Sequence, residues 1–101
     1  MKFRKFSDLG WSVSEIGLGC WEIGGCWGHV SKIDVRDLLK EALDKGVNFF
    51  DTSDVYGDGI SEKFIGELIG STSEKIFVTT KSGLRLQPFV PENYNFKNFE
   101  K

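Results

Sequence analysis

Hydrophobic and polar residues alternate over two short stretches at the start of the chain. The stretches lie on either side of Gly10, and alternation around such a turn predicts a β-hairpin over residues 1–16. The next apolar stretch, EIGLGC at 15–20, predicts a short strand. Residues 21–30 are rich in glycine and aromatic residues, which predicts a loop.

Residues 34–45 have the periodicity of an amphipathic helix. Apolar side chains recur at i, i+3, i+4, i+7 and i+8, namely at Val35, Leu38, Leu39, Ala42 and Leu43. We expect Asp34 to cap the start of this helix and Gly46 to follow its end in the left-handed conformation. Glu41 and Lys45 are four residues apart and are expected to pair on the outer face.

Two further strands and a second helix follow. The run VNFFD at 47–51 lacks polar alternation, which is typical of a parallel strand in a sheet covered on both faces. Ser61 is the expected cap of a helix that ends near Gly70. The apolar face of that helix would consist of Phe64, Ile65, Leu68 and Ile69. KIFVTT at 75–80 predicts another strand, and the Pro- and Asn-rich residues 86–101 predict a loop.

The order of these elements is hairpin, strand, helix, strand, helix, strand. Strands that alternate with helices and carry near-continuous apolar runs predict a parallel α/β fold over residues 17–85. A chain of 101 residues is long enough for one small domain. In parallel α/β folds the carboxyl ends of the strands meet at one rim, and ligands bind there.

Composition and charge exclude several classes of function. The net charge is −2 and the pI is about 5.4, so no nucleic-acid or membrane-surface partner is expected. The apolar runs are too short to span a membrane, and the first residues lack the apolar core of a secretory signal. Cys20, Cys26 and the single His29 do not suffice for a four-ligand zinc site, so we expect reduced thiols and no metal.

Three polar residues are predicted to converge on the rim. Asp51 and Lys81 come at or just after the ends of two successive strands, and Tyr56 lies in the loop between them. Taken singly, they would be a turn residue, a solvated lysine and a packed aromatic. Together they suit proton donation to a carbonyl oxygen, because an ammonium stabilises a nearby phenolate. We therefore expect Tyr56 to be the proton donor, Lys81 to stabilise its phenolate, and Asp51 to anchor Lys81.

The residues around this set resemble those of the aldo-keto reductases. The segment VNFFDTSDVYGDGISEKFIGELIG at 47–70 is similar to that family's motif, in which an Asp ending strand two is followed by a Tyr and a Gly-x-Ser-Glu helix start. TKSG at 80–83 is similar to its strand-three Lys motif, and GLGCWEIGG at 17–25 to its first-strand segment. The resemblance implies the N-terminal part of a TIM (β/α)8 barrel, with a hairpin plug at the bottom of the barrel followed by three parallel βα strands.

An activity and a cofactor are also implied by the resemblance. The activity is that of an oxidoreductase that transfers a hydride from NAD(P)H to the carbonyl of a small aldehyde or ketone. NADPH is favoured and NADH is the alternative. Carried over by position, the residues that contact the cofactor are Gly19, Cys20, Trp21 and Asp51. The resemblance further implies a cytoplasmic protein without a metal.

The sequence departs from the family pattern in two respects. The family's catalytic His ends strand four, whereas the only histidine here, His29, lies in the first loop. The family's phosphate-binding loops follow strands seven and eight, and a complete barrel takes about 250 residues. We therefore expect residues 1–101 to be an N-terminal fragment, an incomplete barrel with little or no activity alone that self-associates through its open edge. The alternative is a non-catalytic protein on the same fold, either a truncated remnant or a binding and regulatory module like the family's potassium-channel beta subunits.

Overall fold

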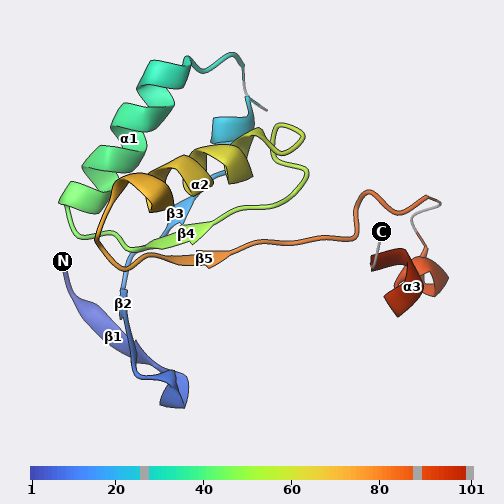
Figure 1. Ribbon diagram of the computed structural model, residues 1–101, viewed down its shortest axis with the longest axis horizontal. Helices are drawn as coiled ribbons and strands as arrows, with labels where there is room; N and C mark the ends of the chain where they lie inside the picture. Colours follow the sequence, from blue (N-terminus) through green and yellow to red (C-terminus); the bar gives the residue numbers. More distant parts are fainter. Residues whose placement is uncertain (26–27, 88–89, 100–101) are drawn as a thin grey trace.

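The computed structural model describes residues 1–25, 28–87 and 90–99. Figure 1 shows a hairpin, a second sheet with two helices over one of its faces, and a short helical region near the C-terminus that lies to one side. The elements, with η for 3-10 helices, are β1 (Phe3–Phe6), η1 (Ser7–Leu9), β2 (Trp11–Ser14), β3 (Leu18–Gly19), η2 (Glu22–Gly24), α1 (Lys32–Asp44), β4 (Phe49–Asp51), α2 (Ile60–Ser71), β5 (Phe77–Thr79), η3 (Pro91–Asn93) and α3 (Phe96–Phe99). The expectation of a reduced Cys26 falls outside the described residues.

The N-terminal hairpin forms as the alternating pattern predicts. β1 pairs antiparallel with β2, and Gly10 turns the chain at a φ of 72°, a left-handed value that favours glycine. Asn48 fastens the hairpin to the second sheet, because its side-chain oxygen accepts the Ser14 N–H at 2.8 Å. The Trp11 and Phe77 rings also pack together, with their centroids 5.0 Å apart.

The second sheet is parallel, with the strand order β3-β4-β5. Its register places Gly19 beside Asp51, and Asp51 beside Thr79. Because the three strands run in the same direction, their carboxyl ends form one rim, as predicted. β3 and β5 are the edge strands, and neither has a further partner strand within the described residues.

A serine, Ser31, caps the N-terminus of α1. The Ser31 Oγ accepts the Asp34 N–H at 3.1 Å, which satisfies one of the free donors of the first turn. The prediction of Asp34 as the cap is therefore wrong: Asp34 lies inside the first turn. Two other predictions are confirmed, because Lys45 pairs with Glu41 at 3.1 Å and Gly46 has a left-handed φ of 92°.

α2 begins earlier than expected, at Ile60. Gly59 occupies its N-cap position with a φ of 94°, and no side chain caps the helix. Ser61, the expected cap, is instead completely buried within the first turn. The helix also continues one residue past Gly70, to Ser71.

Both helices pack on one face of the parallel sheet (Figure 1). The core beneath them consists of Cys20, Ile23, Val35, Leu39, Val47, Phe50, Phe64, Ile65 and Leu68. Leu38 and Ile69 were predicted to lie on the apolar faces of their helices, and they are 48% and 50% exposed, so these faces are only partly covered. No helix of the described residues covers the other face, and Phe49 and Asp51 are only half-buried. The prediction of a sheet covered on both faces is therefore wrong.

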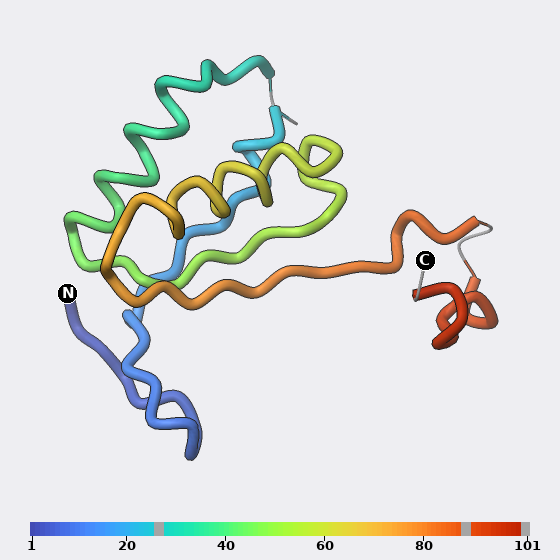
Figure 2. The backbone as a smooth tube through the Cα atoms, in the orientation of Figure 1, coloured from blue at the N-terminus to red at the C-terminus, as the bar shows by residue number. Residues whose placement is uncertain are grey.

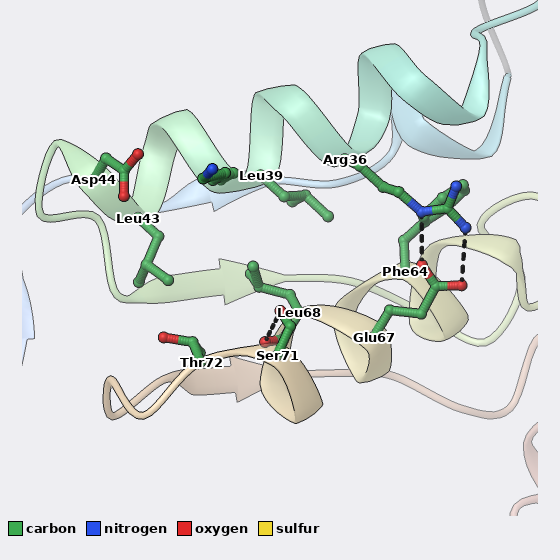
Figure 3. Close-up of a pocket in the computed structure, with 10 residues that line it drawn as sticks. Arg36, Leu39, Leu43, Asp44, Phe64, Glu67, Leu68, Ser71 and Thr72 are labelled. Atoms are coloured by element: carbon green, nitrogen blue, oxygen red, sulfur yellow. Dashed lines mark hydrogen bonds and ion pairs between the residues drawn. The ribbon is translucent and has the colours of Figure 1, made fainter.

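A cleft lies between α1 and α2 (Figure 3). It has a volume of about 490 Å³ and an apolar floor formed by Leu39, Leu43, Phe64 and Leu68. Arg36 Nε and Glu67 Oε2 are 2.9 Å apart and join the two helices. Because both side chains are half-exposed, water screens the two charges and this ion pair adds little to stability.

The segment near the C-terminus leaves the sheet after β5. It was predicted to be a loop, but it contains η3 and the one-turn helix α3, so that expectation is wrong. Figure 2 shows the segment extending away from the sheet and from the two long helices. The radius of gyration is accordingly 15.3 Å, against about 13 Å for a compact domain of 100 residues.

Candidate active site

Three side chains meet at the rim of the parallel sheet. Asp51 ends β4, Lys81 follows β5, and Tyr56 lies in the loop between β4 and α2. Lys81 Nζ lies 2.9 Å from Asp51 Oδ1 and 3.4 Å from Tyr56 Oη. It also lies 5.1 Å from the centroid of the Tyr56 ring. The structure thus brings together the three residues that the sequence indicates as one set.

Two oxygen acceptors other than Tyr56 hold Lys81 in place. Besides Asp51, its ammonium donates to the Thr52 carbonyl at 2.8 Å. The hydrogen bond to Asp51 raises the pKa of Lys81 above its ordinary 10.5. The pKa of Asp51 is lowered from 3.8, first by a hydrogen bond from Thr79 and then by one from Lys81. At neutral pH a cation therefore stands beside the phenol, where it can stabilise a phenolate.

A tight turn presents Tyr56 to Lys81. The Tyr56 N–H donates to the Ser53 carbonyl at 3.2 Å, and the Tyr56 carbonyl accepts the Ser61 N–H at 3.2 Å. Three successive left-handed residues follow, with φ values of 62°, 54° and 94°, namely Gly57, Asp58 and Gly59. Glycine adopts this conformation without a steric penalty, so the turn depends on its two glycines.

Arg85 fastens this turn to the chain that follows β5. Its Nη2 donates to the Asp54 carbonyl and lies 2.6 Å from Asp58 Oδ1, and its Nε lies 3.5 Å from Asp54 Oδ2. The segment that carries Lys81 and the loop that carries Tyr56 are thereby joined a second time. Sequence reasoning missed Arg85, and the two acidic residues flanking Tyr56 were the only signal for it.

Two buried hydroxyl groups lie beneath the loop. Thr52 Oγ1 and Ser61 Oγ are 2.7 Å apart, and Ser61 also donates to the Cys20 carbonyl at 3.1 Å. A buried hydroxyl without a partner costs about 1–3 kcal/mol, so these hydrogen bonds hold their groups in place. They join the carboxyl ends of β3 and β4 to the first turn of α2, and so fix the base from which Tyr56 projects.

The loop after β3 packs backbone to backbone against the loop that carries Tyr56. A Cβ atom on Gly24 would lie 2.3 Å from the Gly57 nitrogen and 2.7 Å from the Tyr56 carbonyl carbon. Only glycine permits so close an approach. The glycine-rich composition of residues 21–30 predicts a loop, but it carries no information about this contact.

The remaining residues implied by the resemblance differ in their exposure. Gly19 pairs with Asp51 and has open space where a side chain would stand, and Trp21 is 49% exposed. Cys20 is completely buried in the core, and this burial raises the pKa of its thiol to about 11. A buried thiol cannot contact a ligand at the rim. A contact of Cys20 with the cofactor would therefore have to come from its backbone, and it stays a prediction.

Other kinds of site are not found in residues 1–25, 28–87 and 90–99. No three His, Cys, Asp or Glu side chains in these ranges could hold a metal ion together. None of the helices in this part of the chain is long and apolar enough to cross a membrane. His29 lies in the loop before α1, as predicted, and its side chain is exposed.

Comparison with known proteins places the chain in a family. The sequence profile of the Aldo/keto reductase family matches residues 15–100. The uncharacterized oxidoreductase Mb2320 of Mycobacterium bovis is 35% identical over 105 residues, which cover 100% of this chain and 31% of that protein. Aldo-keto reductase YhdN of Bacillus subtilis is 34% identical over 87 residues, which cover 83% of this chain and 26% of that protein. The chain thus spans under a third of the length of these relatives.

A solved structure agrees with the sequence comparison. Aldo-keto reductase AKR11C1 from Bacillus halodurans, in its holo form, superposes with a TM-score of 0.71 at 32% identity, over 85% of this chain and 27% of that chain. The predicted fold is confirmed: the hairpin and the three parallel strands form the N-terminal part of a TIM barrel, which is not closed within the described residues. The chain belongs to the aldo/keto reductase family.

Proposed function

We propose that the rim site donates a proton during hydride transfer from a reduced nicotinamide cofactor to a small aldehyde or ketone. One observation supports this proposal above the others: Lys81 Nζ contacts Asp51 Oδ1 at 2.9 Å and Tyr56 Oη at 3.4 Å. A purely binding or regulatory module has no need of a lysine held between a carboxylate and a phenol. The arrangement therefore favours an enzyme over the non-catalytic alternative.

In the proposed reaction Tyr56 is the proton donor. A bound nicotinamide would supply the hydride for the carbonyl carbon, and the negative charge on the carbonyl oxygen would then require a proton. Tyr56 Oη gives its proton to that oxygen, and the Lys81 ammonium stabilises the phenolate that remains. Asp51 and the Thr52 carbonyl keep Lys81 in position.

The rim residues suit the nicotinamide end of such a cofactor. Gly19 leaves open space beside Asp51, and the half-exposed Trp21 has a flat apolar ring system, so we propose that these three residues line the cofactor. NADPH is the proposed form, with NADH as the alternative. The two cations at the described rim, Lys81 and Arg85, are both in ion pairs and are not free to bind phosphates. We therefore expect the 101-residue chain to reduce carbonyl compounds slowly or not at all by itself.

A chimeric enzyme tests the proposed catalytic roles. Residues 15–100 of this chain would replace the aligned segment of aldo-keto reductase YhdN, and NADPH oxidation would be followed with a panel of aldehydes and ketones. We expect turnover by the chimera and a decrease in kcat of about 10²- to 10⁴-fold in its Tyr56→Phe variant, because that change removes only the proton donor.

Tyr94→Phe is the matched control in the same chimera. It makes the same chemical change at a half-exposed residue that packs against Gly83 and takes no part in the hydrogen bonds of Lys81, so the rate should stay near that of the parent chimera. A folded chimera with no turnover, or a Tyr56→Phe variant with the full rate, would contradict the proposal and favour the binding or regulatory module.

We also propose that the chain associates with further copies of itself through its open sheet edges. β3 and β5 lack outer partners within the described residues, and unpaired edge strands tend to pair with other chains. Sedimentation of the purified chain should show oligomers whose share grows with concentration. Val78→Lys places a charge on the β5 edge, where Val78 is 38% exposed, and should weaken this association. A chain that sediments as a monomer at every concentration would refute the idea.

A further inference from the structure

We propose that Thr79 is a positioning residue of the rim site, whose hydroxyl group holds the Asp51 carboxylate in the orientation that binds Lys81. Thr79 Oγ1 donates a hydrogen bond to Asp51 Oδ1 at 2.6 Å. Lys81 Nζ contacts that same oxygen at 2.9 Å. The inference rests on the proposed function for the catalytic roles of Asp51 and Lys81, but the hydrogen bond itself does not depend on that function.

The register of the sheet creates this contact. Thr79 and Asp51 are paired residues on the adjacent parallel strands β5 and β4. Paired residues of neighbouring strands project to the same face of a sheet, so their side chains meet directly. Threonine is also β-branched and restricted about χ1, which limits the directions in which its hydroxyl can point.

Asp51 needs the hydrogen bond from Thr79 because its side chain is exposed to solvent. The side chains of Asp51 and Lys81 are 45% and 51% exposed. Exposed ion pairs are weak, because water competes for the charges and both side chains lose rotational freedom on pairing. A second donor on Oδ1 restricts rotation of the carboxylate before Lys81 binds it. Thr79 and Lys81 both bind Oδ1, so the two together determine how the carboxylate is oriented.

The next residue provides a natural control. Thr80 projects to the opposite side of the strand, because successive residues alternate, and its hydroxyl binds Glu62 on α2 instead of Asp51. Two consecutive threonines thus have different partners. Thr79→Val and Thr80→Val each remove one threonine hydroxyl group, with almost no change in side-chain volume.

The test is a residue-specific titration of the Asp51 carboxyl group. The 101-residue chain would be labelled with ¹³C, and its carboxyl shifts followed by NMR from neutral to acidic pH, in solution or by magic-angle spinning of the associated chain. The hydrogen bond from Thr79 is the largest of the contributions that lower the pKa of Asp51. The pKa of Asp51 should therefore rise in Thr79→Val, return to the parent value in Thr79→Ser, and stay at the parent value in Thr80→Val.

Each outcome decides the inference. An Asp51 pKa in Thr79→Val equal to that of the parent chain, or an equal rise in Thr80→Val, would overturn it. The titration does not require enzymatic activity, so it tests the hydrogen bond from Thr79 even if the proposed function is wrong. In an active chimera with YhdN, Thr79→Val should lower kcat and leave KM nearly unchanged, with the rate restored in Thr79→Ser. A shifted pKa without any decrease in kcat would overturn the positioning role.

Discussion

Replacing Gly24 by alanine will destabilise the chain and displace the loop that carries Tyr56. The added Cβ atom would lie 2.3 Å from the Gly57 nitrogen and 2.7 Å from the Tyr56 carbonyl carbon. Both are backbone atoms, so no side-chain rotation can relieve the overlap. Overpacking costs about 1–3 kcal/mol and occasionally more, and we expect Gly24→Ala to reach about 3 kcal/mol because one of the two loops must move.

The measurement is urea unfolding followed by tryptophan fluorescence at one fixed protein concentration. Gly66→Ala is the matched control, because Gly66 lies inside α2 and its added Cβ would meet no atom within 4 Å apart from its own stretch of helix. Alanine is the better helix former, so this variant should gain about 0.5–1 kcal/mol. Equal unfolding midpoints for Gly24→Ala and the parent chain would show that the two loops are not in close backbone contact.

Phe50→Ala will remove a large fraction of the stability of the chain. Phe50 lies in the middle of β4, is completely buried, and belongs to the core between the sheet and the two helices. Replacing a buried phenylalanine by alanine costs about 3–5 kcal/mol, because apolar contacts are lost and a cavity remains. Small domains are stable by only about 5–15 kcal/mol, so we expect a much lower urea midpoint and partial unfolding at physiological temperature.

Phe96→Ala is the matched control, because it makes the same change at an exposed residue. Phe96 is 80% exposed in α3, and surface substitutions usually change stability by less than about 0.5 kcal/mol. The urea midpoint, followed by circular dichroism, should therefore be lowered strongly by Phe50→Ala and hardly changed by Phe96→Ala. Comparable shifts for the two variants would mean that the helices do not pack on β4 as the structure shows.

Local pattern alone predicts the elements of this chain and the rim where its chemistry lies. The period of the apolar residues identifies α1, and the uninterrupted apolar runs identify β4 and β5, because these signals come from neighbouring residues. Parallel strands direct their carboxyl ends to one side. The sequence therefore suffices to place Asp51, Tyr56 and Lys81 at one rim.

Helix starts and outer helix positions are determined less well by local pattern. Ser31 and Asp34 are both good cap residues, and only the hydrogen bond from the Asp34 N–H to Ser31 shows which one caps α1. Leu38 and Ile69 have the spacing of core residues, but they lie on the outer sides of their helices because the sheet covers only part of each apolar face.

The sequence by itself determined the family, the order of the elements and the three residues of the candidate site, since these depend on motifs and periodicity within short windows. Only the tertiary structure decided what surrounds them. Ser61 binds the Cys20 carbonyl 41 positions away, and Thr79 binds Asp51 28 positions away. The contact of Gly24 with Gly57 is of the same kind. Such contacts join residues that are distant along the chain, and they leave no periodic signal because the packing of strands and loops, not their spacing, brings the partners together.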